Sequence, residues 1–117
     1  MKKKILIVDD DTNVRDYLSS LLEDNDYETV VAGDVQEGIK LARENKPDLI
    51  TLDLEMPGEW GPRFYRHMSQ DAELKNIPVI VISGLSGNEY AISKAVAALT
   101  KPFDRDELLE TVRKAIN

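Results

Sequence analysis

Apolar residues recur along the chain with two alternating spacings. A strand buried on both faces of a parallel sheet is typically short, almost entirely apolar and rich in β-branched residues. Four segments fit this description, namely residues 5–8, 29–31, 49–52 and 79–82, and a weaker fifth candidate spans residues 97–100. In the longer stretches between them, apolar residues recur three or four positions apart, which predicts amphipathic helices.

Five such helices are predicted, and several of their starts carry recognisable signals. The apolar faces of the first, second and last helices contain Val14, Tyr17, Leu18, Leu21 and Leu22, then Val35, Ile39 and Ala42, and finally Leu108, Val112, Ala115 and Ile116. A capping residue precedes a glutamate by three positions in the pairs Asp34 and Glu37, Ser86 and Glu89, and Asp104 and Glu107. Pro62 suits the first turn of the third helix, because proline has no N–H group to leave unpaired there.

Five strands that alternate with five helices predict the α/β class, with right-handed crossovers and a doubly wound parallel sheet covered on both faces. The length of 117 residues is that of one ordinary domain, so we expect residues 1–117 to form a single domain. Ligands of such sheets bind beyond the carboxyl ends of the strands. The residues that follow each strand are therefore the ones in which function is expected.

Composition narrows the possible functions. The chain contains no cysteine, which excludes disulfides and thiolate chemistry and fits a reducing compartment. No apolar stretch approaches the roughly 20 residues of a membrane span, and no export signal follows the basic first residues, so we expect a soluble, cytoplasmic protein without membrane contact. The formal net charge of −7 argues against direct nucleic-acid binding.

Polar or charged residues follow four of the five predicted strands. The first strand is followed by Asp9, Asp10 and Asp11, the third by Asp53, the fourth by Ser83 and the fifth by Lys101 and Pro102. The second strand is followed by Ala32 and Gly33, which carry no side-chain chemistry. Because parallel strands end at one edge of a sheet, the polar side chains are expected to meet in one site.

These residue types together suit phosphoryl transfer. Carboxylates that converge repel one another, and Mg²⁺ relieves the repulsion because it prefers oxygen ligands and joins carboxylates to phosphate. Lys101 supplies a positive charge and Ser83 a hydroxyl donor for phosphoryl oxygens. An ionised Asp53 needs no general base, since this reaction mostly requires in-line positioning and neutralised charge.

Each residue has an ordinary structural interpretation when it is taken alone. The acidic triplet 9–11 can form a solvated turn in which one member caps the first helix. Asp53 can be a turn residue, Ser83 alone indicates nothing, and Lys101 can be a surface charge. The placement of one member at each of four strand ends favours a site.

The same residues resemble the receiver domain of two-component response regulators over essentially the whole chain. The resemblance is carried by Val8-Asp9-Asp10, by Asp53-Leu54-Glu55-Met56-Pro57 with Gly61, by Ser83, and by Lys101-Pro102-Phe103. It implies a flavodoxin-like sheet of strand order 2-1-3-4-5. It also implies that a sensor histidine kinase or a phosphotransfer protein donates a phosphoryl group from its phosphohistidine to Asp53.

The resemblance assigns further roles by position. Asp10 and Asp53 would bind Mg²⁺ directly, Asp9 through water, and Glu55 through its backbone carbonyl. Ser83 and Lys101 would hold the phosphoryl oxygens, and the Lys101-Pro102 peptide is expected to be cis. The domain would then promote its own phosphorylation and dephosphorylation without being an enzyme in the usual sense.

Three positions depart from the family pattern, and one histidine needs an interpretation. Ala98 stands where the family usually has an aromatic ring that rotates inward on activation. Gly84 replaces a frequent alanine and should loosen the following loop, and Trp60 occupies a position that is usually small or acidic. His67 is expected to be solvated and not a phosphate carrier.

The leading hypothesis is a stand-alone receiver, monomeric or weakly dimeric, that acts by binding an output protein. We expect its signal to pass through the loop after the fourth strand to the face formed by the fourth helix, fifth strand and fifth helix. Val14 and Tyr17, early on the first helix, are candidates for kinase docking, although both can instead pack inward.

Alternatives remain open at this level. The chain can be a receiver excised from a longer, for instance DNA-binding, regulator. A phosphatase of the haloacid dehalogenase type also uses Mg²⁺ and an aspartate after a strand, but it needs a second aspartate where this chain has Glu55. A pure interaction module is disfavoured by the acidic pocket with Ser83 and Lys101. Nucleotide binding is disfavoured because no P-loop or G-x-G-x-x-G pattern is present.

Overall fold

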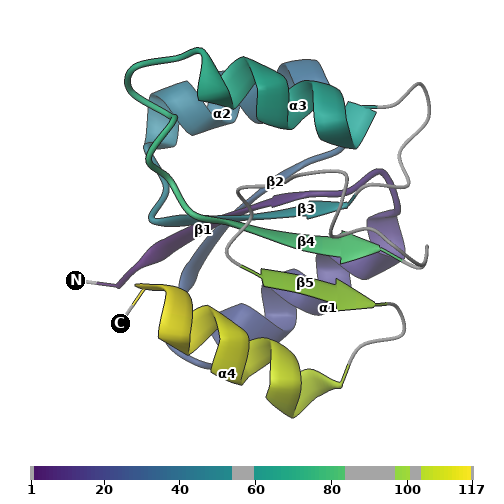
Figure 1. Ribbon diagram of the computed structural model, residues 1–117. Coiled ribbons are helices and arrows are strands. Elements are labelled where there is room, and N and C mark those ends of the chain that lie inside the picture. Colours follow the sequence, from purple (N-terminus) through teal and green to yellow (C-terminus); the bar gives the residue numbers. More distant parts are fainter. Residues whose placement is uncertain (1, 54–59, 84–96, 101–103, 117) are drawn as a thin grey trace.

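The computed structural model describes residues 2–53, 60–83, 97–100 and 104–116 (Figure 1). The strands are β1 (Lys4–Val8), β2 (Glu28–Ala32), β3 (Leu49–Asp53), β4 (Val79–Ser83) and β5 (Ala97–Thr100), and the helices are α1 (Thr12–Glu23), α2 (Val35–Asn45), α3 (Trp60–Ser69) and α4 (Arg105–Ile116). The helix predicted after Ser86 lies outside the described residues, so α4 is the last predicted helix. Each predicted strand is confirmed to within a residue at either end.

All five strands form one parallel sheet in the order β2-β1-β3-β4-β5, which confirms the predicted topology. β2 lies at an edge, and its Val31 remains 41% exposed. The apolar run 29–31 had predicted a strand covered on both faces. An edge strand has a neighbour on one side only, so the helices cover it incompletely.

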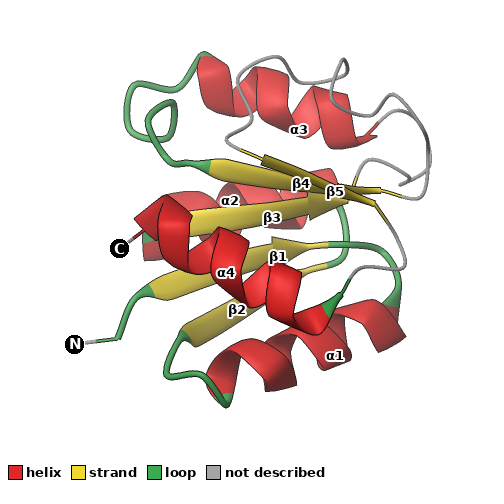
Figure 2. Cartoon of the chain, turned by 60° about the horizontal axis from the view of Figure 1, so that its bottom comes forward, coloured by secondary structure: helices red, strands yellow, loops and turns green. Residues whose placement is uncertain are grey.

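Two apolar layers lie on opposite faces of the sheet, one under α2 and α3 and the other under α1 and α4 (Figures 1 and 2). Successive strand residues point to opposite faces, so each buried strand contributes to both layers. The α2 and α3 side takes Leu6, Val8, Ile50, Leu52, Val79 and Val81, and the α1 and α4 side takes Ile5, Ile7, Leu49, Ile80 and Ile82. This two-sided core buries the central strands, whose carboxyl ends carry the predicted site residues.

Capping interactions set the starts of the helices beside the carboxyl edge of the sheet. The Asp34 carboxylate accepts a hydrogen bond of 2.8 Å from the Glu37 N–H, as the capping sequence predicts. The Glu37 carboxylate reaches back to the N–H of Gly33, at 2.8 Å, and so ties the β2–α2 connection to α2. Among the described helices, none has the length and apolar character needed to cross a membrane.

Candidate functional site

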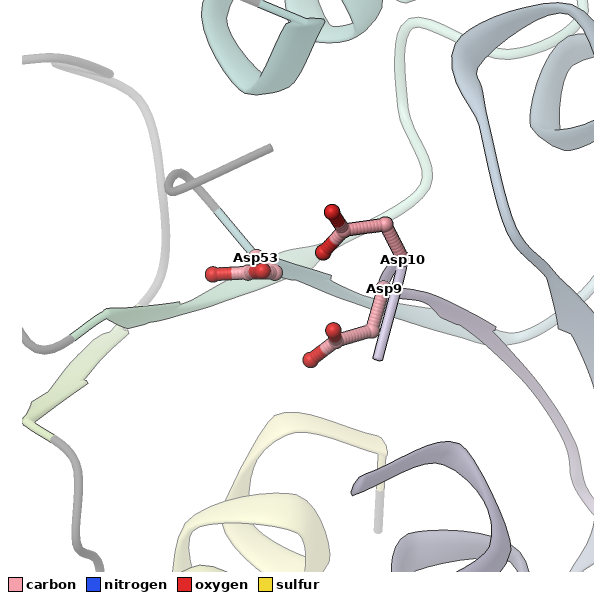
Figure 3. A group of neighbouring side chains, drawn as sticks. All are labelled: Asp9, Asp10 and Asp53. Carbon is pink, nitrogen blue, oxygen red and sulfur yellow. The ribbon is translucent and has the colours of Figure 1, made fainter. Parts of the chain in front are cut away.

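Three carboxylates meet at the carboxyl edge of the sheet. Asp9 and Asp10 directly follow β1, and Asp53 is the last residue of β3. These two strands are neighbours in which Val8 pairs with Leu52, so the residues that follow come side by side. One oxygen from each carboxylate lies within 4.8 Å of the others (Figure 3). The structure thus brings together three of the residues that the sequence predicted to share a site.

The three carboxylates differ in their exposure to solvent. Asp9 is 2% exposed and Asp53 is 3% exposed, whereas Asp10 lies at the surface. The Asp9 carboxylate accepts a hydrogen bond of 2.9 Å from the N–H of Asp11, and its own N–H donates to the Ala32 carbonyl at 3.1 Å. Burial and strand pairing therefore hold Asp9 and Asp53, and the site opens to solvent on the side of Asp10.

The acidic triplet after β1 is divided between two tasks. Asp11 is the N-cap of α1, where its carboxylate accepts hydrogen bonds from the N–H groups of Asn13 at 2.9 Å and Val14 at 3.4 Å. Asp9 and Asp10 gather with Asp53 instead. The capping interpretation is therefore correct for one residue of the three, and the shared-site interpretation describes the placement of the other two.

The donor set fits a small divalent cation. Mg²⁺ binds hard oxygen ligands at about 2.0–2.1 Å in an octahedron, so two ligands on opposite sides lie about 4.2 Å apart. The three carboxylate oxygens lie within 4.8 Å of one another, which is close to the greatest separation of two ligands of one such ion. The pocket therefore offers carboxylate oxygens of the kind that Mg²⁺ prefers, at a spacing that suits ligands of one ion.

Several predicted site residues lie partly or wholly outside the described residues. Ser83 ends β4, one position beyond Ile82, which is the strand partner of Asp53. Its backbone is therefore beside the acidic pocket. Glu55, Lys101 with the Lys101-Pro102 peptide, and the loop after Ser83 are outside the described part of the chain, so their roles stay predictions.

Arg15 belongs to this edge of the sheet and was not singled out from the sequence. Its Nη1 atom donates a hydrogen bond of 2.9 Å to the backbone carbonyl of Asp9, and its Nη2 atom donates to Oγ1 of Thr12 at 3.1 Å. One sequence signal pointed to it, because Arg15 is the only basic residue between positions 9 and 28. An isolated cation within a strongly acidic stretch is a reason to look for a specific partner.

The two candidates for kinase docking differ in exposure. Tyr17 on α1 is 48% exposed, although it is not without contacts, while Val14 is partly buried against the α1 and α4 layer. The interpretation that both pack inward is therefore wrong for Tyr17. His67 is exposed on α3, as expected, and borders an open cavity of about 430 Å³ together with Arg63.

Comparison with known proteins points to one family. The profile of the response regulator receiver domain matches residues 5–113. The chain is 34% identical to protein Rrf1 of Nitratidesulfovibrio vulgaris, covering 99% of this chain and 84% of that protein. It is also 34% identical to protein PilH of Pseudomonas aeruginosa, covering 97% of each chain.

Solved structures agree with this assignment. The chemotaxis protein CheY4 of Vibrio cholerae superimposes with a TM-score of 0.92 at 27% identity, covering 98% of this chain and 99% of that one. The family profile, the related sequences and the similar structure each match nearly the full length of the chain. The chain therefore belongs to the response regulator receiver domain family, the signalling domains of two-component systems.

Proposed function

We propose that Asp53 is the phosphoacceptor of this receiver domain, and that it takes the phosphoryl group from the phosphohistidine of a sensor histidine kinase or a phosphotransfer protein. One observation carries the proposal: Asp53 ends a central strand within 4.8 Å of the carboxylates of Asp9 and Asp10. A lone strand-end aspartate has many uses. An aspartate set among two further carboxylates at the ligand-binding edge of a parallel sheet suits metal-assisted phosphoryl transfer.

The strands on either side of β3 hold Asp53 in position to attack a phosphorus atom. β1 and β4 pair with β3, and Asp53 itself pairs with Ile82, so the backbone that carries the carboxylate is held on both sides. The residue is almost fully buried. A carboxylate held in one place saves the entropy of positioning when the phosphorus atom approaches in line.

The proposed metal is Mg²⁺, with Asp10 and Asp53 as direct ligands, Asp9 acting through water and Glu55 through its carbonyl. When bound, Mg²⁺ would offset the negative charge of the carboxylates and of the phosphoryl oxygens. Ser83 would donate its hydroxyl to one phosphoryl oxygen and Lys101 would neutralise another. The position of Ser83 at the end of β4, next to the partner of Asp53, supports its assignment.

We further propose that residues 1–117 form one cytoplasmic receiver domain, monomeric or weakly dimeric, that signals by binding an output protein. It would promote its own phosphorylation and dephosphorylation and would not turn over an external substrate. Tyr17, exposed on the first turns of α1, would contribute to kinase docking. The signal would leave through the loop that follows Ser83 and the surface that includes β5 and α4.

The test is incubation with Mg²⁺ and a small-molecule phosphodonor, followed by intact mass measurement. Wild-type protein should gain one phosphoryl group, and Asp53→Asn should gain none. Chelation of Mg²⁺ should prevent labelling of the wild type. Full labelling of Asp53→Asn, or labelling that chelation leaves unchanged, contradicts the proposal, and steady turnover of a generic phosphoester would favour a phosphatase instead.

A further inference from the structure

The exposed position of Asp10 raises the question of what aims its carboxylate. Burial holds Asp9 and Asp53, and both lie at the ends of paired strands. Asp10 has neither constraint, because it is exposed and lies in the connection between β1 and α1. Its direction depends on the peptide group that joins it to Asp9, since rotation of that peptide swings the Asp10 side chain.

Arg15 holds that peptide group. Its Nη1 atom donates to the Asp9 carbonyl at 2.9 Å, and this carbonyl belongs to the peptide that leads into Asp10. Its Nη2 atom donates to Oγ1 of Thr12 at 3.1 Å, which fixes the plane of the guanidinium group. One hydrogen bond of this rigid planar group holds the Asp9 carbonyl and the other holds the guanidinium itself, so together they restrain the direction of the peptide.

Gly33 lies against the guanidinium group of Arg15. A Cβ atom added at Gly33 would overlap Nη1 of Arg15, so the guanidinium lies against the backbone of the β2–α2 connection. That backbone is itself tied down, because the Gly33 N–H donates to Glu37 at 2.8 Å. Arg15 therefore sits between two connections at the carboxyl edge of the sheet, and its position requires a glycine at residue 33.

We propose that Arg15 is a positioning residue that aligns the Asp10 carboxylate for metal binding, with Gly33 providing the space it occupies. The inference rests on the proposed function, because it assigns Arg15 a part in the same site. Arg15 acts through the Asp9–Asp10 peptide and touches neither metal nor phosphoryl group. Removing it leaves Asp53 in place, since β3 holds that residue, and loosens Asp10 alone.

The inference is tested by titrating metal-free protein with Mg²⁺ in a calorimeter. Arg15→Ala should raise the Kd for Mg²⁺ by about tenfold, the lower end of the effect that loss of a residue supporting a metal ligand produces. Arg15→Lys should be intermediate, because an ammonium group can donate to the Asp9 carbonyl but lacks the planar group that Thr12 holds in place. Phosphodonor labelling should return to the wild-type rate at saturating Mg²⁺, because Asp53 is unaffected.

Gly33→Ala is the sharper variant because it leaves Arg15 in the sequence. The added methyl group meets the far end of a flexible side chain, and Gly33 has no left-handed backbone conformation, so the guanidinium moves and the fold remains. Gly33→Ala should weaken Mg²⁺ binding in the same direction as Arg15→Ala. Arg66→Ala, which removes an exposed arginine on α3, is the matched control and should keep the wild-type Kd.

Thermal unfolding of each variant in chelator separates positioning from stability, because a purely structural role lowers the Tm and leaves the Kd of the folded protein unchanged. If Arg15→Ala does not fold, Gly33→Ala and Arg15→Lys decide the same question. The inference is overturned if Arg15→Ala keeps the wild-type Kd. It is also overturned if Gly33→Ala and Arg15→Lys both keep that Kd. Wild-type protein that binds Mg²⁺ but is not labelled on Asp53 contradicts the proposed function alone, and wild-type protein that binds no Mg²⁺ contradicts both.

Discussion

The two edges of the sheet use their acidic residues differently. At the amino edge, the Asp48 carboxylate accepts a hydrogen bond of 2.8 Å from the N–H of Lys4. Asp71, in the connection from α3 to β4, accepts one from the Glu73 N–H and forms an ion pair of 3.0 Å with Arg43. At the carboxyl edge, three carboxylates instead lie within 4.8 Å of one another. The carboxylates of the amino edge hold connections in place, whereas those of the carboxyl edge also lie close enough to repel one another, even though Asp9 has the Asp11 N–H as a local donor.

The acids at the amino edge contribute to stability, and those at the carboxyl edge are suited to binding a cation. A carboxylate with a local donor stabilises the folded state, while clustered carboxylates destabilise it until a cation binds. Among the described residues, Arg15 lies beside the cluster, and it donates to a carbonyl and a hydroxyl group. The carboxyl edge is therefore expected to respond strongly to Mg²⁺ and the amino edge to respond to pH only.

The largest expected effect is stabilisation by Mg²⁺. At a free concentration of one hundred times the Kd, the ion should raise the free energy of unfolding by about 2.7 kcal/mol. Asp10→Asn should lose most of this gain, because a neutral amide replaces a charged ligand. Asp71→Asn, at the amino edge, should gain as much as the wild type. Denaturant unfolding with and without Mg²⁺ measures both, and equal gains in all three proteins would remove the distinction between the edges.

The second prediction concerns the metal-free protein, in which the sign reverses. Asp10→Asn should raise the free energy of unfolding by about 1 kcal/mol, because it removes one of three mutually repelling charges at a partly solvated site. The measurement is denaturant unfolding in chelator at neutral pH and moderate salt. High salt should reduce the gain through screening. A loss of stability in Asp10→Asn without metal would show that the cluster is not strained by repulsion.

The third prediction tests the amino edge by pH. The Glu73 N–H, and after it the Arg43 guanidinium, lower the pKa of the Asp71 carboxyl below its ordinary value of 3.8. A lowered pKa in the folded state means that Asp71 stabilises the fold above pH 3.8 and that this contribution is lost as the pH falls through the lowered value. Asp71→Asn should therefore be less stable than the wild type at neutral pH.

The difference between the two proteins should shrink in acid, as unfolding curves at a series of pH values will show. Its size is expected to be smaller than either effect at the carboxyl edge, because Arg43 is exposed and solvent screens the pair. Glu28→Gln, a change at an exposed acid in β2, is a comparison for general charge effects. A difference that persists unchanged into acid would contradict the assignment.

The smallest expected effect is at the end of α2. Lys46 closes this helix in a left-handed conformation, with φ of 46° and ψ of 63°. Residues other than glycine are strained in this conformation, whereas glycine loses more entropy on folding. The net effect of Lys46→Gly should be a stabilisation of a few tenths of a kcal/mol. Lys40→Gly, inside α2, should instead cost about 1 kcal/mol. Thermal unfolding of the pair decides, and a loss of stability in both would contradict the prediction.

Much of the fold and part of the site follow from local pattern. The runs 5–8, 49–52 and 79–82 predict buried strands because each places apolar residues on both faces, and all three are strands of the sheet, whereas the order β2-β1-β3-β4-β5 was implied only by the family resemblance. Asp9, Asp10 and Asp53 were predicted to converge because parallel strands end at one edge of a sheet. To predict this convergence it is enough to know which residues follow the strands, and the spacing of apolar residues shows where each strand ends.

The sequence by itself therefore determined the strands, their parallel arrangement and the gathering of the carboxylates. Only the tertiary structure decided which acid of the triplet caps α1, that Val31 lies exposed on an edge strand, and that Arg15 rests against Gly33. Gly33 had been set aside as a residue without chemistry. Gly33 matters because it leaves space for the Arg15 side chain, eighteen positions earlier. A local sequence pattern cannot predict this contact, because it joins α1 to the β2–α2 connection.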